Sequence, residues 1–423
     1  MERAELAWTL GASTVVAQEA RNIFISESEP ARFMAAFAQA VANGGNVFLC
    51  DPAWGQNERE ELAVRTTNQI LAEAKQAALP QSEILNLKSE IAGGPARGWL
   101  MIASGGTSGR LKFARHDQDT LNAAVEGFAA HFNVAQVNAV GVLPLHHVSG
   151  LMAWMRCALT GGKFLPASWS EIETGRRPAM GDSGEWFLSL VPTQLQRLLA
   201  QPEAVGWLRR FRAVFLGGGP AWPDLLDRAA EARVPLAPSY GLTETVAMVA
   251  TLRPQEFLGG SRSSGAVMPH ARIDVTGEGT LRITGESVFR GYFPEWRTER
   301  DFTTDDLGFI DGNGHVQVTG RRDGIIITGG KKVSPTEVEA TLRATGEFDD
   351  VAVLGVPDPE WGEAVVACYP ATARAPDLER VARTLAGQLA APALPKRYVA
   401  VTEWPRNAQG KLNRALLAEK MRK

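Results

Sequence analysis

The sequence has little cysteine, no long hydrophobic run and almost no net charge. Its three cysteines, Cys50, Cys157 and Cys368, lie far apart in apolar stretches, so we expect buried free thiols in a reducing cytoplasm rather than a disulfide framework or a metal site. No apolar stretch approaches the roughly 20 residues of a membrane span, and the first residues lack a signal-peptide pattern. A net charge of -3 argues against a dedicated nucleic-acid-binding protein.

Strand-like and helix-like segments alternate through the first 250 residues of this 423-residue chain. Such alternation is typical of an α/β fold with parallel strands, and the length predicts more than one domain. Apolar spacing predicts helices over 31–41, 58–78 and 119–132, and strands over 45–51, 99–103, 138–145, 186–191, 211–216 and 234–238.

The pattern changes after residue 254. Short alternating segments up to about residue 320 predict a small β-rich subdomain, and the rest of the chain predicts a small α+β domain. In that domain Ser334 and Glu337 form a capping box that begins a helix through Thr345. Further segments predict strands over 351–356, 364–369 and 396–401 and a helix over 378–389.

The stretch IASGGTSGRLK, residues 102–112, stands out chemically. A predicted strand leads into six consecutive Gly, Ser and Thr residues, and Lys112 closes the stretch. Glycines allow the backbone to approach a ligand, and free N–H groups, hydroxyls and a lysine can bind phosphate oxygens. A flexible surface turn fits the stretch equally well, and the pattern matches neither the P-loop nor the dinucleotide-binding glycine motif.

Four later predicted strands also end in polar or glycine-rich segments. In open parallel sheets, ligands bind at the carboxyl ends of the strands. We therefore expect the glycine stretch and these four segments to meet at one edge. They are residues 146–150, 192–193, 217–220 and 239–245.

Five motifs, in this order, resemble those of the adenylate-forming superfamily of acyl-CoA synthetases, adenylation domains and luciferases. They are SGGTSGRLK (104–112), SYGLTET (239–245), TTDDLG (303–308), GRRDGIIITGGKKVSPTEVE (320–339) and PRNAQGKLNR (405–414). The resemblance implies an N-terminal ATP- and acyl-binding domain over 1–320 and a mobile C-terminal domain over 324–423, with a hinge near Asp323. It also implies a reaction in which ATP and a carboxylate give an acyl-adenylate, whose acyl group then passes to a thiol.

Three stretches resemble the 2-succinylbenzoate–CoA ligases of menaquinone and phylloquinone synthesis more closely. They are GGTSGRLKFARHD (105–117), VLPLHHVSGLMAWMR (142–156) and SSGAVMPHARI (263–273). This resemblance implies 2-succinylbenzoate, ATP and CoA as substrates. A CoA ligase for another aryl or short acyl acid, or a stand-alone adenylation protein that loads a carrier domain, remains an alternative. The oligomeric state stays open.

The resemblance assigns the triphosphate to the glycine stretch. The residues are Ser104, Gly105, Gly106, Thr107, Ser108, Gly109 and Lys112. Most members of the superfamily have proline where this chain has Leu111, and glycine where it has Asp305. Neither departure has an explanation in the sequence.

The second and third motifs would bind the rest of the nucleotide. Tyr240 would flank the adenine, Thr243 would contact the phosphates, and Glu244 would hold Mg²⁺, a hard cation that takes carboxylate and phosphate oxygens. Asp306 would accept the ribose hydroxyls and Arg321 would lie at the ribose or α-phosphate. The glycines Gly217 and Gly218 would pass the adenine and the acyl pocket.

The resemblance also implies two residues at the reacting carboxylate. Lys411 would enter the site for adenylation and stabilise the charge that develops on the α-phosphate. His147 would gate the acyl acid or contact its carboxylate, with His146 beside it. Ser149, Thr193, Ser264 and Gly265 are further candidates for the pocket lining.

Overall fold

The computed structural model describes residues 22–65, 69–71, 98–105, 111–181, 185–219, 221–371, 375–406 and 412–422. Near its N-terminus, a five-stranded sheet has the order β3-β1-β2-β4-β5, in which only the β4–β5 pair is antiparallel. Its strands are β1 (Asn22–Ile25), β2 (Asn46–Leu49), β3 (Gln69–Leu71), β4 (Leu100–Gly105) and β5 (Leu111–His116). The helices α1 (Pro30–Ala42) and α2 (Gln56–Arg65) connect the first three of these strands.

A seven-stranded sheet forms the centre of the chain, with the order β12-β11-β10-β9-β8-β6-β7. Strands β6 to β10 run parallel, and β11 and β12 are antiparallel additions at one side. The strands are β6 (Asn138–Gly141), β7 (Phe164–Pro166), β8 (Trp186–Leu190), β9 (Ala213–Leu216), β10 (Leu236–Leu242), β11 (Ala247–Thr251) and β12 (Ala266–Val267). The helices are α4 (Gln118–Phe132), α5 (Val148–Thr160), α6 (Trp169–Glu173), α7 (Pro192–Leu199), α8 (Pro202–Leu208), α9 (Pro223–Glu231) and α10 (Pro254–Leu258).

Two smaller sheets follow along the chain. An antiparallel sheet contains β13 (Ala271–Val275), β14 (Thr280–Gly285), β15 (Asp301–Ile310) and β16 (Val316–Arg321). The last sheet contains β17 (Ile326–Thr328), β18 (Lys331–Val333), β19 (Ala352–Asp358), β20 (Gly362–Pro370) and β21 (Arg397–Val401). Its helices are α11 (Pro335–Ala344), α12 (Leu378–Ala386) and α13 (Arg414–Arg422).

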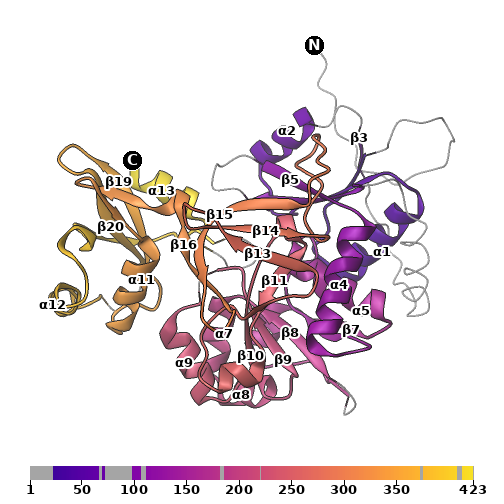
Figure 1. Cartoon of the computed structure of the whole chain (residues 1–423), viewed down its shortest axis with the longest axis horizontal. Helices are drawn as coiled ribbons and strands as arrows, with labels where there is room; N and C mark the ends of the chain where they lie inside the picture. Colours follow the sequence, from indigo (N-terminus) through magenta and orange to yellow (C-terminus); the bar gives the residue numbers. More distant parts are fainter. Residues whose placement is uncertain are drawn as a thin grey trace.

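The C-terminal sheet and its helices lie to one side of the remaining elements, next to β16 and α9 (Figure 1). The Arg343 guanidinium of α11 lies over the Trp222 ring at 4.3 Å, and the Gln196 amide donates to the Asp349 carbonyl at 3.3 Å. These few contacts link the C-terminal part to the helices α7 and α9.

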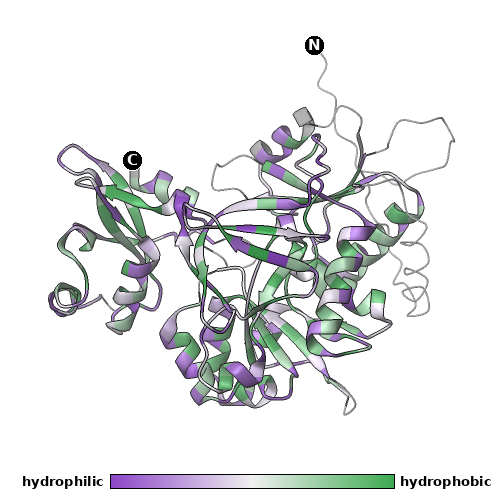
Figure 2. Ribbon diagram, in the orientation of Figure 1, coloured by the Kyte–Doolittle hydropathy of each residue, from purple (hydrophilic) through white to green (hydrophobic). Residues whose placement is uncertain are grey.

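The strands of the central sheet are largely hydrophobic, as Figure 2 shows. Two adjoining clusters of buried apolar side chains cover this sheet, and separate clusters fill the N-terminal and C-terminal sheets. The three cysteines are free and buried, as predicted. Among the described residues no helix is long and apolar enough to span a bilayer.

The mixed α/β fold and most predicted elements are confirmed, with several differences. The strand predicted over 138–145 ends at Gly141, and the helix predicted over 378–389 ends at Ala386. The helix predicted over 58–78 ends at Arg65, and Gln69–Leu71 forms strand β3. Strand β5 was not predicted, and β10 continues through Leu242, so the SYGL sequence lies in a strand rather than a loop. Helix α11 begins after Ser334 as predicted, but the Ser334 side chain makes no capping hydrogen bond, so the capping box was wrong.

Candidate active site

The glycine stretch connects the two antiparallel strands β4 and β5. Ser104 lies opposite Lys112 in this hairpin, and Gly105 lies opposite Leu111. The Lys112 ammonium lies 5.2 Å from the centre of the Tyr292 ring, a distance at which a cation is attracted to an aromatic face. The predicted phosphate-binding residues Gly106, Thr107, Ser108 and Gly109 lie outside the described residues, as does Lys411.

Leu111, which replaces the usual proline, has a structural reason in this chain. Its backbone N–H donates to Glu61 Oε2 at 3.2 Å, and its side chain packs into a cluster with Phe24, Phe48 and Phe113. Proline has no N–H and could not make this hydrogen bond. The bond ties the start of β5 to helix α2, which lies 50 residues earlier in the chain.

Glu244 is the centre of the site. It lies in a short 3₁₀ helix, η1 (Thr243–Thr245), directly after β10, and is buried. Its Oε1 atom accepts hydrogen bonds from the Ser104 hydroxyl at 2.6 Å and the Tyr292 hydroxyl at 2.7 Å. Its Oε2 atom accepts no hydrogen bond from the described residues. A carboxylate with one oxygen that accepts nothing from the described residues fits the single carboxylate through which Mg²⁺ is often held beside nucleotide phosphates.

The backbone around Glu244 is constrained from both sides. Val246 and Ala247 have φ angles of 52° and 74°, a left-handed conformation that is rare for a β-branched residue. On the other side, a side chain at Gly241 would meet the Ala247 carbonyl at 1.8 Å, so only glycine fits. The Thr243 carbonyl lies 2.8 Å from Nε2 of the buried His116. These contacts fix the direction in which Glu244 points.

A second group of polar side chains joins β10 to the end of β16. The Tyr240 hydroxyl donates to Asp306 Oδ2 at 2.8 Å, and Arg321 donates to Asp306 Oδ1 at 3.1 Å. Arg321 also donates twice to Asp323, at 2.8 Å each. The hydrogen bonds to Asp323 raise the pKa of Arg321, which is therefore always charged. Burial and the charge of Asp306 raise the pKa of Tyr240, so its hydroxyl stays a donor.

Asp305, the other unexplained departure, pairs with two arginines. It accepts a hydrogen bond from Arg322 at 2.8 Å and lies 3.7 Å from Arg321. The side chains of Asp305 and Arg322 are each more than 40% exposed. The extra acid thus balances the arginine pair at the end of β16 without entering the site.

The remaining predicted residues lie where the parallel strands end. Gly217 and Gly218 follow β9, and Gly218 has a φ of 76°, which glycine adopts without strain. His147 directly precedes α5, and its ring centre lies 4.3 Å from that of His146. A cavity of about 340 Å³ has His131, Arg212 and Arg253 in its wall, and none of these is a predicted site residue.

Two residues of interest were not predicted from the sequence. Tyr292, the second hydroxyl donor to Glu244, comes from a loop 48 residues further along the chain. Arg156 was also missed, although an arginine inside the apolar segment LMAWMRCAL (151–159) is a visible anomaly. A charged residue in the middle of a buried apolar helix is rarely there without a partner or a function.

Arg156 is 3% exposed and points from α5 toward aromatic side chains. Its guanidinium lies 4.4 Å from the centre of the Phe128 ring, its Nε atom is buried without a hydrogen bond, and no acid pairs with it among the described residues. Burial lowers the pKa of Arg156 to about 10, so it is charged at neutral pH. It lines a small cavity of about 10 Å³, which has room for one water molecule, together with Phe187, Ser189 and Phe215.

The chain matches two family profiles. The AMP-binding enzyme profile matches residues 18–293, and the AMP-binding enzyme C-terminal domain profile matches residues 337–411. A 2-succinylbenzoate–CoA ligase of Listeria monocytogenes is 32% identical over 288 residues, which are 66% of this chain and 60% of that protein. An indoleacetate–CoA ligase of Aromatoleum aromaticum is 31% identical over 340 residues, or 76% of this chain and 67% of that protein.

A solved structure is also similar. It is the o-succinylbenzoate CoA synthetase from Bacillus subtilis in complex with its acyl-adenylate intermediate, with a TM-score of 0.77, 22% identity, and coverage of 95% of this chain and 88% of that one. At that identity the likeness shows the fold. The chain spans about three fifths of the length of the first relative that it matches. The first profile alone covers more than half of the chain, and the chain therefore belongs to the AMP-binding enzyme family.

Proposed function

We propose that this protein is an ATP-dependent acid–CoA ligase and that its acid is 2-succinylbenzoate. In the first step a carboxylate oxygen of the acid attacks the α-phosphorus of ATP, and pyrophosphate leaves with the bonding electrons. In the second step the sulfur of CoA attacks the acyl carbon, AMP leaves, and the thiol proton is released. The site supports this reaction because Glu244, Asp306 and Lys112 lie on segments that meet at the β4–β5 hairpin and the end of β10.

Each predicted site residue named below has a role in the proposed first step. Asp306 accepts hydrogen bonds from the ribose hydroxyls. It can do so while it also accepts from Tyr240 and Arg321, because each carboxylate oxygen has two lone pairs. Glu244 would hold Mg²⁺ through Oε2, and the bound ion would supply positive charge to neutralise that of the leaving pyrophosphate. Lys112 and the glycine stretch hold the triphosphate. Lys411 reaches the α-phosphate when the C-terminal domain, residues 324–423, turns about Asp323.

The observation that carries the choice of acid is Arg156, which is buried and has no acid partner among the described residues. 2-Succinylbenzoate has an aromatic ring and two carboxylates, of which only one is activated. The second carboxylate needs a cation if it is to leave water, because burying an unpaired charge is costly. Arg156, among Phe128, Phe187 and Phe215, offers a cation beside aromatic surface, and the cavity of about 10 Å³ that they line must widen to admit the second carboxylate. Indoleacetate, the acid named for one relative, has a single carboxylate and no use for a second buried cation.

Steady-state kinetics test this proposal. Purified protein with ATP, CoA and 2-succinylbenzoate should release AMP and pyrophosphate and form the thioester. Arg156→Met should lower kcat/KM for 2-succinylbenzoate by about 100-fold, because a charge-assisted hydrogen bond to a buried carboxylate is lost, and leave the KM for ATP unchanged. Arg272→Met, at an exposed arginine, is the control.

Three results would contradict the proposal. The first is no turnover of 2-succinylbenzoate beside fast turnover of indoleacetate, benzoate or a fatty acid. The second is an equal effect of Arg156→Met on acids with one and two carboxylates. The third is faster transfer to a phosphopantetheinyl carrier protein than to CoA, which would favour a stand-alone adenylation protein.

With 2-succinylbenzoate as its acid, the enzyme acts in menaquinone or phylloquinone synthesis in the cytoplasm.

A further inference from the structure

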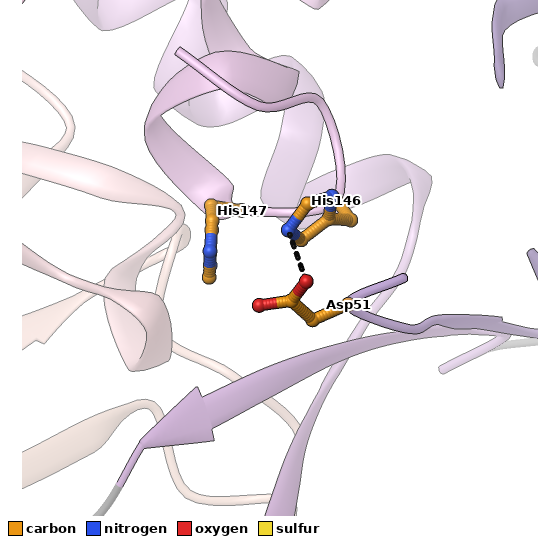
Figure 3. Close-up of side chains that lie close together, drawn as sticks. All are labelled: Asp51, His146 and His147. Carbon is orange, nitrogen blue, oxygen red and sulfur yellow. Dashed lines mark ion pairs between the residues drawn. The ribbon is translucent and has the colours of Figure 1, made fainter. Parts of the chain in front are cut away.

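A histidine pair and an aspartate meet at a place where two sheets come together. Asp51 follows the end of β2 in the N-terminal sheet, and His146 and His147 follow the end of β6 in the central sheet. All three side chains point into a common space, as Figure 3 shows. One ligand atom from each lies within 4.8 Å of the others, and this is the only such group of His, Cys, Asp or Glu among the described residues.

The ring nitrogens of His146 have no hydrogen-bond partner among the described residues. The residue is 5% exposed, and its Nδ1 and Nε2 atoms are both buried without a hydrogen bond. The Nε2 atom lies 3.5 Å from Asp51 Oδ1, which is longer than a good N–H···O hydrogen bond. Buried polar atoms without partners are rare, because each loses its water without compensation. A cation between the imidazole and the carboxylate would supply the missing partner.

Asp51 is held in place for such a role. Its Oδ1 atom accepts the backbone N–H of Ala53 at 2.9 Å, and its backbone carbonyl accepts the N–H of Trp54 at 3.1 Å. A ligating carboxylate that is itself hydrogen-bonded keeps its orientation. The Oδ2 atom accepts no hydrogen bond from the described residues, so it can face a metal.

We propose that Asp51, His146 and His147 form a site for a late first-row divalent metal ion, with Zn²⁺ as its natural occupant. Two imidazole nitrogens and one carboxylate oxygen suit Zn²⁺, Co²⁺ or Ni²⁺, whereas Mg²⁺ prefers oxygen ligands alone. Tetrahedral Zn²⁺ places its ligand atoms about 3.3 Å apart, so the three side chains must approach one another by up to about 1.5 Å. The proposal requires rotation of the imidazole rings to cover this distance. The fourth position remains open for water.

The site has a consequence that does not depend on the proposed ligase activity. A bound ion ties the end of β2 to the start of α5, so it stabilises the folded chain by an amount that grows with the logarithm of the metal concentration above the dissociation constant. Its two imidazole ligands distinguish it from a Mg²⁺ position at Glu244, where oxygen ligands are preferred.

Metal titration of the chelator-stripped, full-length protein tests the proposal without any enzyme assay. Calorimetry should show one Zn²⁺ bound per chain with a dissociation constant of about 1 µM or lower, and Co²⁺ should give the visible absorption of a tetrahedral site that Zn²⁺ abolishes. His146→Gln and Asp51→Asn should each weaken binding at least about tenfold. The melting temperature should rise with Zn²⁺ in the wild type and not in these variants.

The matched control is His315→Gln. His315 Nε2 also lies 3.5 Å from a carboxylate, that of Glu256, but no third ligand joins this pair. This variant should bind Zn²⁺ as tightly as the wild type. Melting curves without metal show whether each variant is folded. The proposal is overturned if the wild type binds no Zn²⁺ at micromolar concentration, if folded His146→Gln and Asp51→Asn bind it unchanged, or if His315→Gln loses it equally.

Discussion

The Ser104 hydroxyl donates a 2.6 Å hydrogen bond to Glu244 across 140 residues of sequence. The Tyr292 hydroxyl donates to the same oxygen at 2.7 Å. Burial and the nearby charge of Glu244 raise the pKa of Tyr292, so this hydroxyl remains a donor over the physiological range. Two protein donors thus hold one oxygen of the carboxylate and orient the other.

Removing one of these donors should leave the orientation of the Glu244 carboxylate less fixed without unfolding the protein. We expect Tyr292→Phe to lower kcat for pyrophosphate release about tenfold, the loss of roughly one hydrogen bond to a charged group. The Mg²⁺ concentration for half-maximal rate should rise in parallel, while the KM for the acid should not change. Rate measurements over a Mg²⁺ titration check this. Tyr398→Phe, at a half-buried tyrosine of the C-terminal sheet, is the control, and an unchanged Mg²⁺ dependence in Tyr292→Phe would exclude the positioning role.

The assignment of Lys411 predicts a split between the two half-reactions. Lys411→Ala should lower the rate of acyl-adenylate formation by about 100-fold or more, because a preorganised positive charge at the α-phosphate is lost. Thioester formation from supplied acyl-adenylate and CoA should stay within about threefold of wild type. Rapid-quench assays of each half-reaction separate the two. Equal loss in both would exclude a role of Lys411 confined to adenylation.

The buried ion pair between Asp117 and Arg290 should matter for stability. Arg290 donates to both Asp117 oxygens, at 2.8 and 3.2 Å, and both residues are about 95% buried. Asp117→Asn leaves the buried Arg290 with the exposed Asp119 carboxylate, 4.0 Å away, as a weak partner, so the free energy of unfolding should fall by about 3–5 kcal/mol. Urea unfolding measures this. Asp274→Asn breaks the exposed pair with Arg272 and should have little effect; similar losses in the two variants would refute the distinction.

The sequence was sufficient to single out two segments that the structure places in contact. The strand–glycine stretch at Ser104 and the SYGLTET segment at Glu244 each have a distinctive local composition, and the structure brings the two together. Long apolar or amphipathic segments such as 31–41 and 119–132 were also predicted correctly, because burial of one helical face decides them.

Residues whose role depends on a distant partner could not be predicted. Leu111 is explained by Glu61, and Asp305 by Arg322. Tyr292 acts through Glu244, and no pattern near residue 292 indicates this contact. Strand β5 escaped prediction because its six residues, LKFARH, carry three charges or imidazoles and pair with β4 and, through Ala114, with the distant Tyr292. Tertiary pairing decides such strands more than local propensity does.

The stability of the protein should fall below neutral pH because of buried neutral histidines. His116 is fully buried, and burial lowers its pKa from 6.5 to about 4 despite the hydrogen bond to Thr243 and the charge of Asp117; Arg290 lowers it further. Burial likewise lowers the pKa values of His131 and His270 to about 4. Between pH 6.5 and 4 the unfolded chain therefore binds protons that the folded chain does not, so stability is complete above pH 6.5 and is lost as the pH falls toward 4.

Replacing His116 isolates its share of this loss. Each such histidine contributes a slope of about 1.4 kcal/mol per pH unit between its two pKa values. The glutamine amide of His116→Gln can still donate to the Thr243 carbonyl but does not titrate, so the slope should decrease by one histidine's contribution. Urea unfolding of both proteins between pH ~7 and ~5 measures the two slopes. Identical slopes in wild type and variant would contradict this prediction. They would mean that His116 takes up its proton at the same pH in the folded and the unfolded protein.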